Sequence, residues 1–220
     1  MSATSPIEGE RRLRRDAARN RRLILDAARE AFAARGLHVT LDEIARWAGV
    51  GVGTVYRRFA DKESLIDALF EDGIGEVVAL AEDALHYEDS WAGFVHWFEG
   101  FVAMQAQDRG LKEVLLSSRG SQQRIAAASE RLLPLISRLV KRAQDAGELR
   151  ADVRPTDIPL MGRMLAGIAD ITADVSPELF RRYVAIALDG LRVSRDAPSR
   201  LPARALKLEQ LEAIRRARGT

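Results

Sequence analysis

The sequence predicts an all-α protein, and three observations lead to this fold class. Apolar residues recur at spacings of three and four along most of the 220 residues, which is the periodicity of amphipathic helices. Runs of useful length that alternate apolar and polar residues, the pattern of a half-buried strand, are absent. Glycines, prolines and capping residues stand at the ends of the periodic segments. We therefore expect an N-terminal three-helix domain followed by a larger helical domain.

The bulk composition is that of a soluble globular protein, with 47% hydrophobic and 30% charged residues. No apolar run is long enough to cross a bilayer, and the arginine-rich N-terminus lacks the apolar segment of a secretory signal. We therefore expect a cytoplasmic protein without a membrane partner. The sequence contains no cysteine, which excludes disulfides, cysteine-based zinc sites and thiol catalysis.

The first helix is expected from near Arg19 to Arg35, where Gly36 ends it. Its apolar stripe consists of Leu23, Ile24, Ala27, Ala28, Ala31 and Phe32. Residues 1–15 are polar, lack periodicity and contain Pro6 and Gly9, so a disordered basic arm is expected there.

The most informative segment is TLDEIARWAGVGVGTVYRRFADKESLI, residues 40–66. Thr40 followed by Glu43 forms the T-x-x-E pattern of a capping box, which begins a helix, and Gly49 can end that helix in the left-handed conformation. A second short helix follows, with Val50 and Val55 filling the angle between the two. This is the pattern of a helix-turn-helix, whose second helix lies in the DNA major groove. We expect a DNA-binding domain over residues 16–62.

Charge is distributed unevenly along the chain, although the net charge of the whole is only +2. Residues 11–60 hold twelve arginines against five acidic residues, a net charge of +7, so the remainder carries −5. A solvated charged surface is the ordinary explanation of such residues. Because the positive block coincides with the helix-turn-helix, we interpret it as the electrostatic footprint of a polyanion-binding domain.

The next two expected helices begin the larger domain, which we place at residues 63–195. Asp61 can cap a helix from Lys62 to about Leu85, bent at Gly73 and Gly75. Asp89 or Ser90 can cap the second, whose bulky side chains are Trp91, Phe94, Val95, Trp97, Phe98, Phe101 and Met104. These occupy more than one stripe, so the helix should be surrounded by protein, either as a dense core or as the wall of an apolar pocket.

Four further helices are expected. They are Leu111–Ser117, then Gln122 to Ala146 with a kink at Pro134, a helix capped by Thr156 and running to about Ala173, and one opened by Ser176-Pro177-Glu178. The last two are strongly amphipathic. They are either ordinary core or a surface that pairs with its copy in a four-helix dimer interface. The tail, residues 196–220, contains one more helical patch, LKLEQLEAIRRAR.

With this layout, the sequence resembles the TetR family of transcriptional regulators. The resemblance is specific over residues 19–70, where G-V-x-x-G-T-hydrophobic-Y-x-x-F is followed by Lys62. Over residues 71–195 it is architectural, and implies a helical ligand-binding and dimerisation domain whose ligand does not transfer. Gly51 departs from the family, in which a Ser or Thr often caps the second helix of the motif; glycine is a weaker cap.

The resemblance implies that Val52 to Phe59 form the recognition helix. Val52 and Gly53 then offer apolar or main-chain contacts to bases, and Arg57 a bidentate contact to guanine. The DNA-binding residues it implies are Thr40, Arg46, Val52, Gly53, Thr54, Tyr56, Arg57, Arg58 and Lys62, with Thr40, Thr54, Tyr56 and Lys62 holding phosphates. The Tyr56 ring has the alternative of packing against the first helix. The arginines at 11, 12, 14 and 15 either enter a minor groove or only solubilise the chain.

The resulting prediction is a regulator, most simply a repressor, that binds a palindromic double-stranded DNA operator as a homodimer. A small apolar or amphipathic effector releases it by moving the helix that follows Lys62. The candidate effector-binding residues, each of which is also a candidate core residue, are Trp91, Phe94, Trp97, Phe98, Phe101, Met104, Leu111, Leu133, Met161 and Met164. Of these, Trp97, Phe101 and Met104 fall off the main core stripe. No cofactor is expected.

Three alternatives to an effector-responsive regulator follow from the same sequence. A metal-responsive regulator could use Glu82 with His86, or His96 with Glu99, because these helical spacings allow both side chains to bind one metal ion. Ordinary exposed polar residues on helices explain these pairs as well. A DNA-binding protein that does not switch would not need so large an aromatic-rich domain. An enzyme is not expected, because neither G-x-S-x-G nor a phosphate-cradling glycine loop occurs, and GVGVG lies inside the helix-turn-helix.

Overall fold

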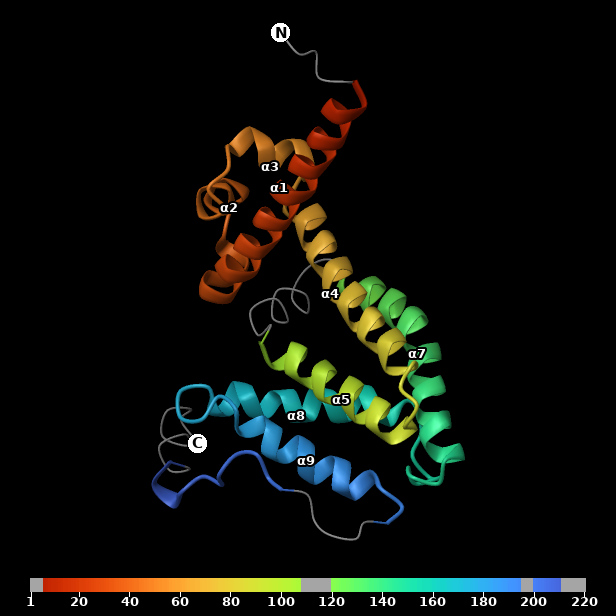
Figure 1. Ribbon diagram of the computed structural model, residues 1–220. Helices are drawn as coiled ribbons and strands as arrows, with labels where there is room; N and C mark the ends of the chain where they lie inside the picture. The colour runs from red at the N-terminus through yellow and green to blue at the C-terminus, as the bar shows by residue number, and fades with distance from the viewer. Residues whose placement is uncertain (1–5, 108–119, 195–199, 211–220) are drawn as a thin grey trace. The chain divides into compact units, whose positions relative to one another are not determined.

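The computed structural model describes residues 6–107, 120–194 and 200–210, and within them the fold is helical as predicted (Figure 1). The only β-type pairing in these ranges is an isolated bridge between Leu149 and Arg192. The elements are α1 (Pro6–Arg35), the 3-10 turn η1 (Gly36–His38), α2 (Leu41–Trp47), α3 (Val52–Arg58), α4 (Lys62–Ala84), α5 (Ser90–Gln107), α7 (Ser121–Asp145), α8 (Asp157–Thr172) and α9 (Leu179–Leu191). The expected helix Leu111–Ser117 lies outside the described residues, as does most of the tail patch.

The chain forms two compact units. The first contains residues 1–73 and 110–124, and the second contains residues 74–109 and 125–220. Helix α4 passes from the first unit to the second after Gly73, and α7 does so after Arg124. The sequence-based boundary after residue 62 differs from this division, because the first half of α4 packs with the helix-turn-helix. No helix in the described ranges combines the length and apolar character needed to cross a bilayer.

The first helix is longer than expected. Helix α1 begins at Pro6, whereas the sequence analysis placed a disordered arm over residues 1–15, of which residues 1–5 lie outside the described residues. Proline is favoured at the first helical position, where its missing N–H has no partner to lose, and the acidic Glu8 and Glu10 suit the positive end of the helix. The prediction of a disordered arm is therefore wrong for residues 6–15, which belong to α1.

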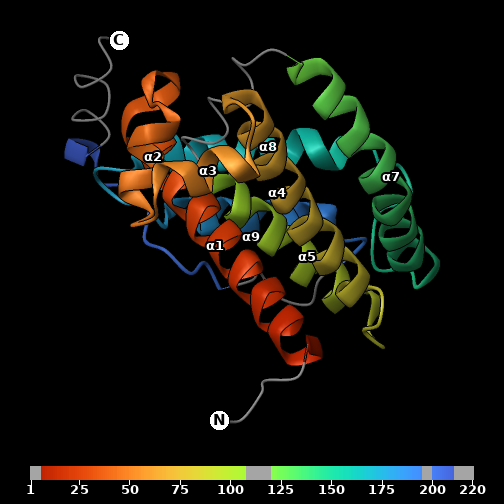
Figure 2. The same cartoon turned by 90° about the horizontal axis from the view of Figure 1, so that it is seen from above.

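The core of the first unit is shared by α1, α2, α3 and the first turns of α4. Figures 1 and 2 both show α2 and α3 lying next to α1. Its buried side chains are Ile24, Leu25, Ala28, Ala31, Phe32, Val39, Leu41, Ile44, Ala45, Val55, Phe59, Leu65, Ile66 and Leu69. Two ion pairs add to this contact: Asp72 of α4 accepts from Arg21 at 3.5 Å and from Arg29 at 3.0 Å. The first half of α4 is thereby fixed to α1.

The second unit is built around α5, which packs against α8 and α9. The crossing with α8 is close at Gly162, where an added Cβ would lie 2.5 Å from Cε1 of Phe101. Phe94, Trp97 and Phe98 are fully buried in this core, as expected for a helix that is surrounded by protein. Glycine at position 162 is thus required by packing, because any side chain would displace the aromatic ring.

Helix ends in the second unit differ in part from the sequence prediction. Asp89 caps α5, since its carboxylate accepts the N–H groups of Trp91 and Ala92, both at 2.9 Å. Thr156 makes no side-chain capping bond at α8; Asp157 instead accepts the N–H of Arg154 at 2.8 Å. Ser176, Pro177 and Glu178 form the turn before α9, which begins at Leu179.

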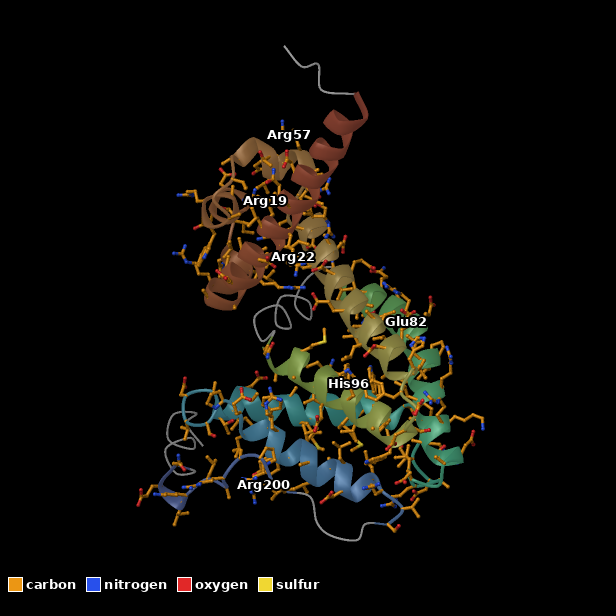
Figure 3. The ribbon with its side chains drawn as sticks, viewed as in Figure 1. Arg19, Arg22, Arg57, Glu82, His96 and Arg200 are labelled. Carbon is orange, nitrogen blue, oxygen red and sulfur yellow. The ribbon has the colours of Figure 1, made fainter. Side chains whose placement is uncertain are left out.

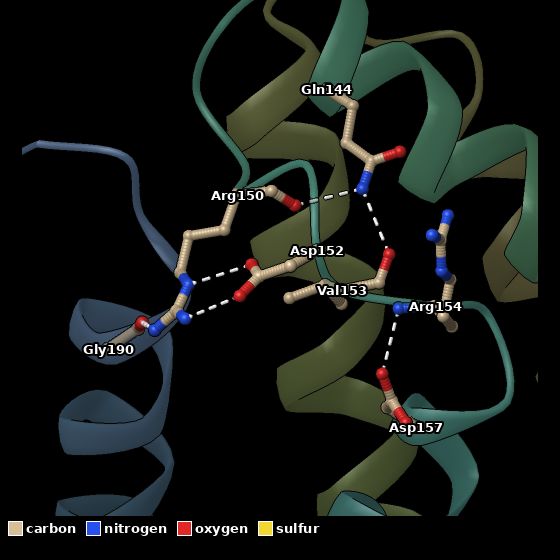
Figure 4. Close-up of polar contacts among 7 residues, drawn as sticks. All are labelled: Gln144, Arg150, Asp152, Val153, Arg154, Asp157 and Gly190. Atoms are coloured by element: carbon tan, nitrogen blue, oxygen red, sulfur yellow. Dashed lines mark hydrogen bonds and ion pairs between the residues drawn. The ribbon is translucent and has the colours of Figure 1, made fainter.

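The connection from α7 to α8 is held by polar contacts, which Figure 4 shows in detail. The Gln144 side-chain amide donates to the main-chain oxygens of Arg150 and Val153. Arg150 makes a bidentate ion pair with Asp152, at 2.7 and 3.0 Å, and its hydrogen bond lowers the pKa of the Asp152 carboxyl. It also donates to the main-chain oxygen of Gly190 in α9. The loop is thereby attached to the last turn of α9.

Candidate functional site

The helix-turn-helix is formed by α2 and α3, joined by a glycine turn. Gly49 has φ of +64°, the left-handed conformation that the sequence predicted. The N–H of Val50 then reaches back to the main-chain oxygen of Ala45 at 3.0 Å, which closes the end of α2. Val55 is fully buried between the helices. The turn therefore fixes the angle at which α3 leaves α2.

The predicted capping box at the start of α2 is confirmed. The N–H of Glu43 donates to the Thr40 hydroxyl oxygen at 3.3 Å, and the Thr40 N–H donates to the Glu43 carboxylate at 2.9 Å. That main-chain bond, followed by one from the Thr40 hydroxyl, lowers the pKa of Glu43. Arg35 pairs with the same carboxylate at 3.1 Å. For Thr40 to hold a phosphate, as predicted, its N–H and hydroxyl must leave Glu43.

One face of α3 is exposed, and its residues are a valine, a glycine, a tyrosine and an arginine. Val52, Gly53, Tyr56 and Arg57 are exposed, whereas Val55 and Phe59 face the core. A Cβ added at Gly53 would meet nothing within 4 Å, so another surface can approach the main chain closely there. This face has the residue types needed to contact base edges: an apolar group for a thymine methyl and a guanidinium for guanine.

Arg57 is held along α3 by its neighbour one turn earlier. Its Nη2 donates to the Thr54 hydroxyl oxygen at 3.3 Å, and the side chain remains exposed (Figure 3). The Thr54 N–H in turn donates to the main-chain oxygen of Gly51 at 2.8 Å, in the first turn of α3. Gly51 itself contributes no side-chain cap, as the sequence implied.

Tyr56 is directed toward α2. Its hydroxyl is hydrogen-bonded to Asp42, and this bond, followed by the negative charge of Asp42, raises the pKa of Tyr56. The side chain is 50% exposed, so the ring is far from buried against the first helix. Its phosphate contact stays a prediction, which requires the hydroxyl to exchange Asp42 for a phosphate oxygen.

Lys62, the first residue of α4, is engaged within the unit. Its Nζ donates to the main-chain oxygen of Leu37 at 2.6 Å and to that of Val39 at 3.4 Å. These carbonyls belong to the η1 turn and the residue after it, so Lys62 connects the end of α1 to the start of α4. No periodicity or motif in the sequence predicts these partners. The phosphate contact of Lys62 stays a prediction.

Four further arginines of the first unit are exposed: Arg19, Arg22, Arg46 and Arg58. Arg46 donates to the main-chain oxygen of Asp42, on the same helix, at 3.3 Å. Arg58 and, on α1, Arg19 and Arg22 are exposed and form no ion pair within the described ranges (Figure 3). Neither Arg19 nor Arg22 is among the DNA-binding residues predicted from the sequence, although both belong to the +7 block. Residues 11–15 lie on α1, and the entry of their arginines into a minor groove stays a prediction.

The aromatic candidates of α5 come together in the second unit. Trp97 stacks on Phe101 with ring centroids 5.2 Å apart, and Phe94 stacks on Phe98 at 5.9 Å and on Trp91 at 5.6 Å. Met104 and Met161 are half-buried against the same core. The expectation that Trp97 and Phe101 lie off the core stripe was wrong, because both belong to the buried core cluster, at 0% and 9% exposed.

Two of the other effector-binding candidates do not face this core. Leu133 is 38% exposed and Met164 is 63% exposed, so neither lines an interior site. Both were chosen for their helical spacing, which identifies an apolar stripe but not the neighbour that covers it. Leu111 lies outside the described residues.

The histidine pairs considered for metal binding are arranged differently from the expectation. Nδ1 of His86 contacts the main-chain oxygen of Glu82 at 2.7 Å, not its carboxylate. His96 lies 3.5 Å from the carboxylate of Asp83 and stacks on Tyr87. Within the described ranges, no group of three or more His, Asp or Glu side chains has the geometry to hold a metal ion.

An open groove that the sequence did not predict lies between α9 and the segment at residues 200–205. It has a volume of about 710 Å³ and is lined by Arg182, Arg200, Leu201, Pro202, Ala203, Arg204 and Ala205. Arg182 donates to the main-chain oxygen of Ala203 at 3.1 Å, which ties this segment to α9. The groove does not include the aromatic residues of α5.

Two family models match the sequence. The model described as "Bacterial regulatory proteins, tetR family" matches residues 24–69, and that described as "Transcriptional regulator SbtR-like, C-terminal domain" matches residues 89–193. A relative in Pseudomonas putida, the HTH-type transcriptional regulator SrpR, is 32% identical over 61% of this chain and 65% of its own length, just under two thirds.

Solved structures agree with these matches. A TetR transcription regulatory protein from Mycobacterium vanbaalenii is 36% identical, with a TM-score of 0.64 over 82% of this chain and 99% of its own. The structure of a SmeT–triclosan complex is 25% identical, with a TM-score of 0.58 over 86% of this chain and 99% of its own.

Proposed function

This chain belongs to the TetR family of bacterial transcriptional regulators, and we propose that it represses transcription as a homodimer that a small molecule releases from DNA. In this proposal residues 16–62 bind the operator, and residues 63–195 hold the effector and the dimer interface. The protein is a binding protein rather than an enzyme, and acts in the cytoplasm, where the chromosome is.

The observation that carries the proposal is the exposed face of α3. Recognition helices in this motif insert their N-terminal residues into the major groove, and Val52, Gly53, Tyr56 and Arg57 are the exposed residues of that region. We assign Arg57 to guanine and Val52 to a thymine methyl. Thr40, Thr54, Tyr56 and Lys62 are assigned to phosphates, and Arg46 and Arg58 to further contacts with the sugar-phosphate backbone of the DNA.

The proposed dimer interface is the outer face of α8 and α9. Leu160, Met164 and Ile171 of α8 are exposed at helical spacing, as are Tyr183 and Ile186 of α9. A monomer rarely leaves so many large apolar side chains uncovered on two packed helices. Pairing this face with its copy would bury it in a four-helix arrangement and place two recognition helices on one duplex.

The effector is assigned to the α5 core of the second unit. Aromatic side chains gathered on a helix that packs against α8 and α9 suit an apolar ligand. The 25%-identical SmeT was solved as a complex with triclosan, an apolar aromatic molecule, which supports an apolar effector for this chain. Effector binding would change the position of α4, the helix that leads from α3 into the second unit.

The test is selection of DNA from a random pool by the purified full chain, combined with sedimentation at several protein concentrations. We expect an enriched palindrome whose half-site centres lie about 34–36 Å apart, or 10–10.5 base pairs, and a dimer in solution. Met164→Glu should give a monomer with weaker operator binding, whereas Leu208→Glu, an equally exposed residue outside α8 and α9, should not. A monomeric wild-type chain without sequence preference would contradict the proposal.

A further inference from the structure

Two buried hydrogen-bond donors on α5 have no acceptor. They are the indole N–H of Trp97, whose side chain is 0% exposed, and the side-chain amide nitrogen of Gln105; neither has a hydrogen-bond partner within the described ranges. Buried polar groups in folded proteins are nearly always paired, because a donor removed from water without an acceptor costs free energy. Two unpaired donors on one helix therefore indicate a missing partner.

Trp97, Phe101 and Gln105 lie on one face of α5, because they are spaced at i, i+4 and i+8. The rings of Trp97 and Phe101 are nearly parallel, 8° apart in orientation. A Cβ added at Gly162 of α8 would lie 2.5 Å from Phe101 and 3.0 Å from the Gln105 amide nitrogen. This face is therefore turned toward α8, and Phe101 lies between the two donors.

The surroundings of Trp97 define which acceptor fits. Its ring neighbours are Phe94, Phe98 and Phe101, and its side chain belongs to a cluster of buried apolar residues. An anionic group buried there would need a cation beside it, and none of these side chains supplies one. A neutral oxygen, by contrast, needs only the donor, and flat aromatic walls favour a flat aromatic partner.

We propose that the effector is a neutral, planar aromatic molecule whose carbonyl or ether oxygen accepts the indole N–H of Trp97. Phe101 is the most accessible of the buried α5 rings, at 9% exposed, and it moves aside to admit the ligand beside Trp97. Gln105, two turns further along α5, offers its amide to a second acceptor on larger ligands. The inference rests on the proposed function, since it names the ligand class of the same helical domain.

Matched planar probe pairs test the inference, each pair differing in one carbonyl oxygen: 9-fluorenone with fluorene, and 1-acenaphthenone with acenaphthene. The affinities of the full chain for all four are measured by equilibrium dialysis. We expect each ketone to bind about tenfold more tightly than its hydrocarbon, the effect of one hydrogen bond in an apolar site. Trp97→Phe should abolish this preference and retain binding of the hydrocarbon. Trp91→Phe is the matched control on the same helix and should keep the preference.

A second measurement uses the unsubstituted chain, so it does not depend on whether a variant folds. The chain has three tryptophans, so its ¹⁵N-labelled form gives three indole N–H signals. We expect the Trp97 signal alone to move downfield with 9-fluorenone and not with fluorene. Equal affinity for both members of each pair, binding of neither ketone, or an unmoved Trp97 signal would overturn the inference. Operator binding, measured without any probe, is unaffected by these outcomes; its loss would instead reject the proposed function.

Discussion

Arg124 of α7 bridges two carboxylates that lie one turn apart on α4. Its Nε donates to Asp67 at 2.6 Å and its Nη2 to Glu63 at 2.9 Å, and the arginine side chain is only 10% exposed. Without this cation, Glu63 and Asp67 would be like charges at i, i+4, which destabilises a helix. Both acids immediately follow the helix-turn-helix, so Arg124 stabilises the helix that positions it.

We predict that Arg124→Gln lowers the free energy of unfolding by about 1–2 kcal/mol. This free energy lies between the contribution of a hydrogen bond to a charged group and that of an exposed ion pair. The reason is that the Arg124 side chain is only 10% exposed, whereas the carboxylates of Glu63 and Asp67 are 42% and 60% exposed. Urea unfolding measures it. Lys141→Gln is the control, since its pair with Asp145 is exposed on both sides and should contribute no more than about 0.5 kcal/mol. Equal effects of the two substitutions would contradict the assignment.

Arg57→Ala is expected to relax specificity at one base pair of each half-site by about 1–3 kcal/mol. The physical reason is the loss of a bidentate guanidinium contact from the exposed face of α3. Competition binding with single-base operator variants measures it. Arg58→Ala, which removes an equal charge from the same helix, should weaken all sequences alike. An unchanged base preference in Arg57→Ala would rule out direct readout by this residue.

Lys62→Ala separates two roles of one side chain. If Nζ reaches a phosphate in the complex, the substitution weakens binding to all sequences alike and reduces the slope of log affinity against log salt by about 1. Loss of its bonds to Leu37 and Val39 should also lower the melting temperature of the free protein. A lower melting temperature with an unchanged salt slope would show that Lys62 is structural only.

The capping box predicts a pH dependence. Because the hydrogen bonds from the Thr40 N–H and hydroxyl hold the folded-state pKa of Glu43 below its ordinary value of 4.5, its ionised form contributes stability above that pH. This contribution is lost as the pH falls below about 4.5 and through the lower folded-state pKa. Melting temperatures of the wild type and Glu43→Gln, measured from neutral to acidic pH, should therefore converge on acidification. A constant difference between the two would contradict the sign of the shift.

Local features of the helix-turn-helix were predictable from the sequence, and long-range partners were not. Thr40 with Glu43, and the left-handed Gly49, depend on neighbours within a few residues, so their pattern determines their structure. The carbonyl partners of Lys62 and the carboxylates beside Arg124 are distant in sequence, and no periodicity encodes them. For the candidate effector site, the bulky residues on more than one stripe of α5 predicted a helix surrounded by protein, but helical spacing wrongly set Trp97 apart from the core. It could not show that the indole N–H of Trp97 lacks an acceptor, because that depends on every neighbouring element.

Gly73 and Gly75 lie inside α4, where it passes from the first unit to the second. A Cβ at either position would meet nothing within 4 Å, so packing does not require glycine there. A glycine in a helix interior costs about 0.8–1 kcal/mol relative to alanine. We therefore predict that Gly73→Ala and Gly75→Ala each raise the free energy of unfolding by about that amount, measured by urea denaturation.

Gly162→Ala is the matched contrast to the α4 substitutions, because its added methyl would meet Phe101 at 2.5 Å and should destabilise the protein. If the α4 glycines keep that helix pliable, the Gly73→Ala/Gly75→Ala double variant should bind the operator as the wild type does but need more effector for release. A stabilised double variant with unchanged release would show that pliability at these positions has no part in the response. Loss of stability in both α4 variants would contradict the steric argument itself, because the added methyl groups would then have met a neighbour.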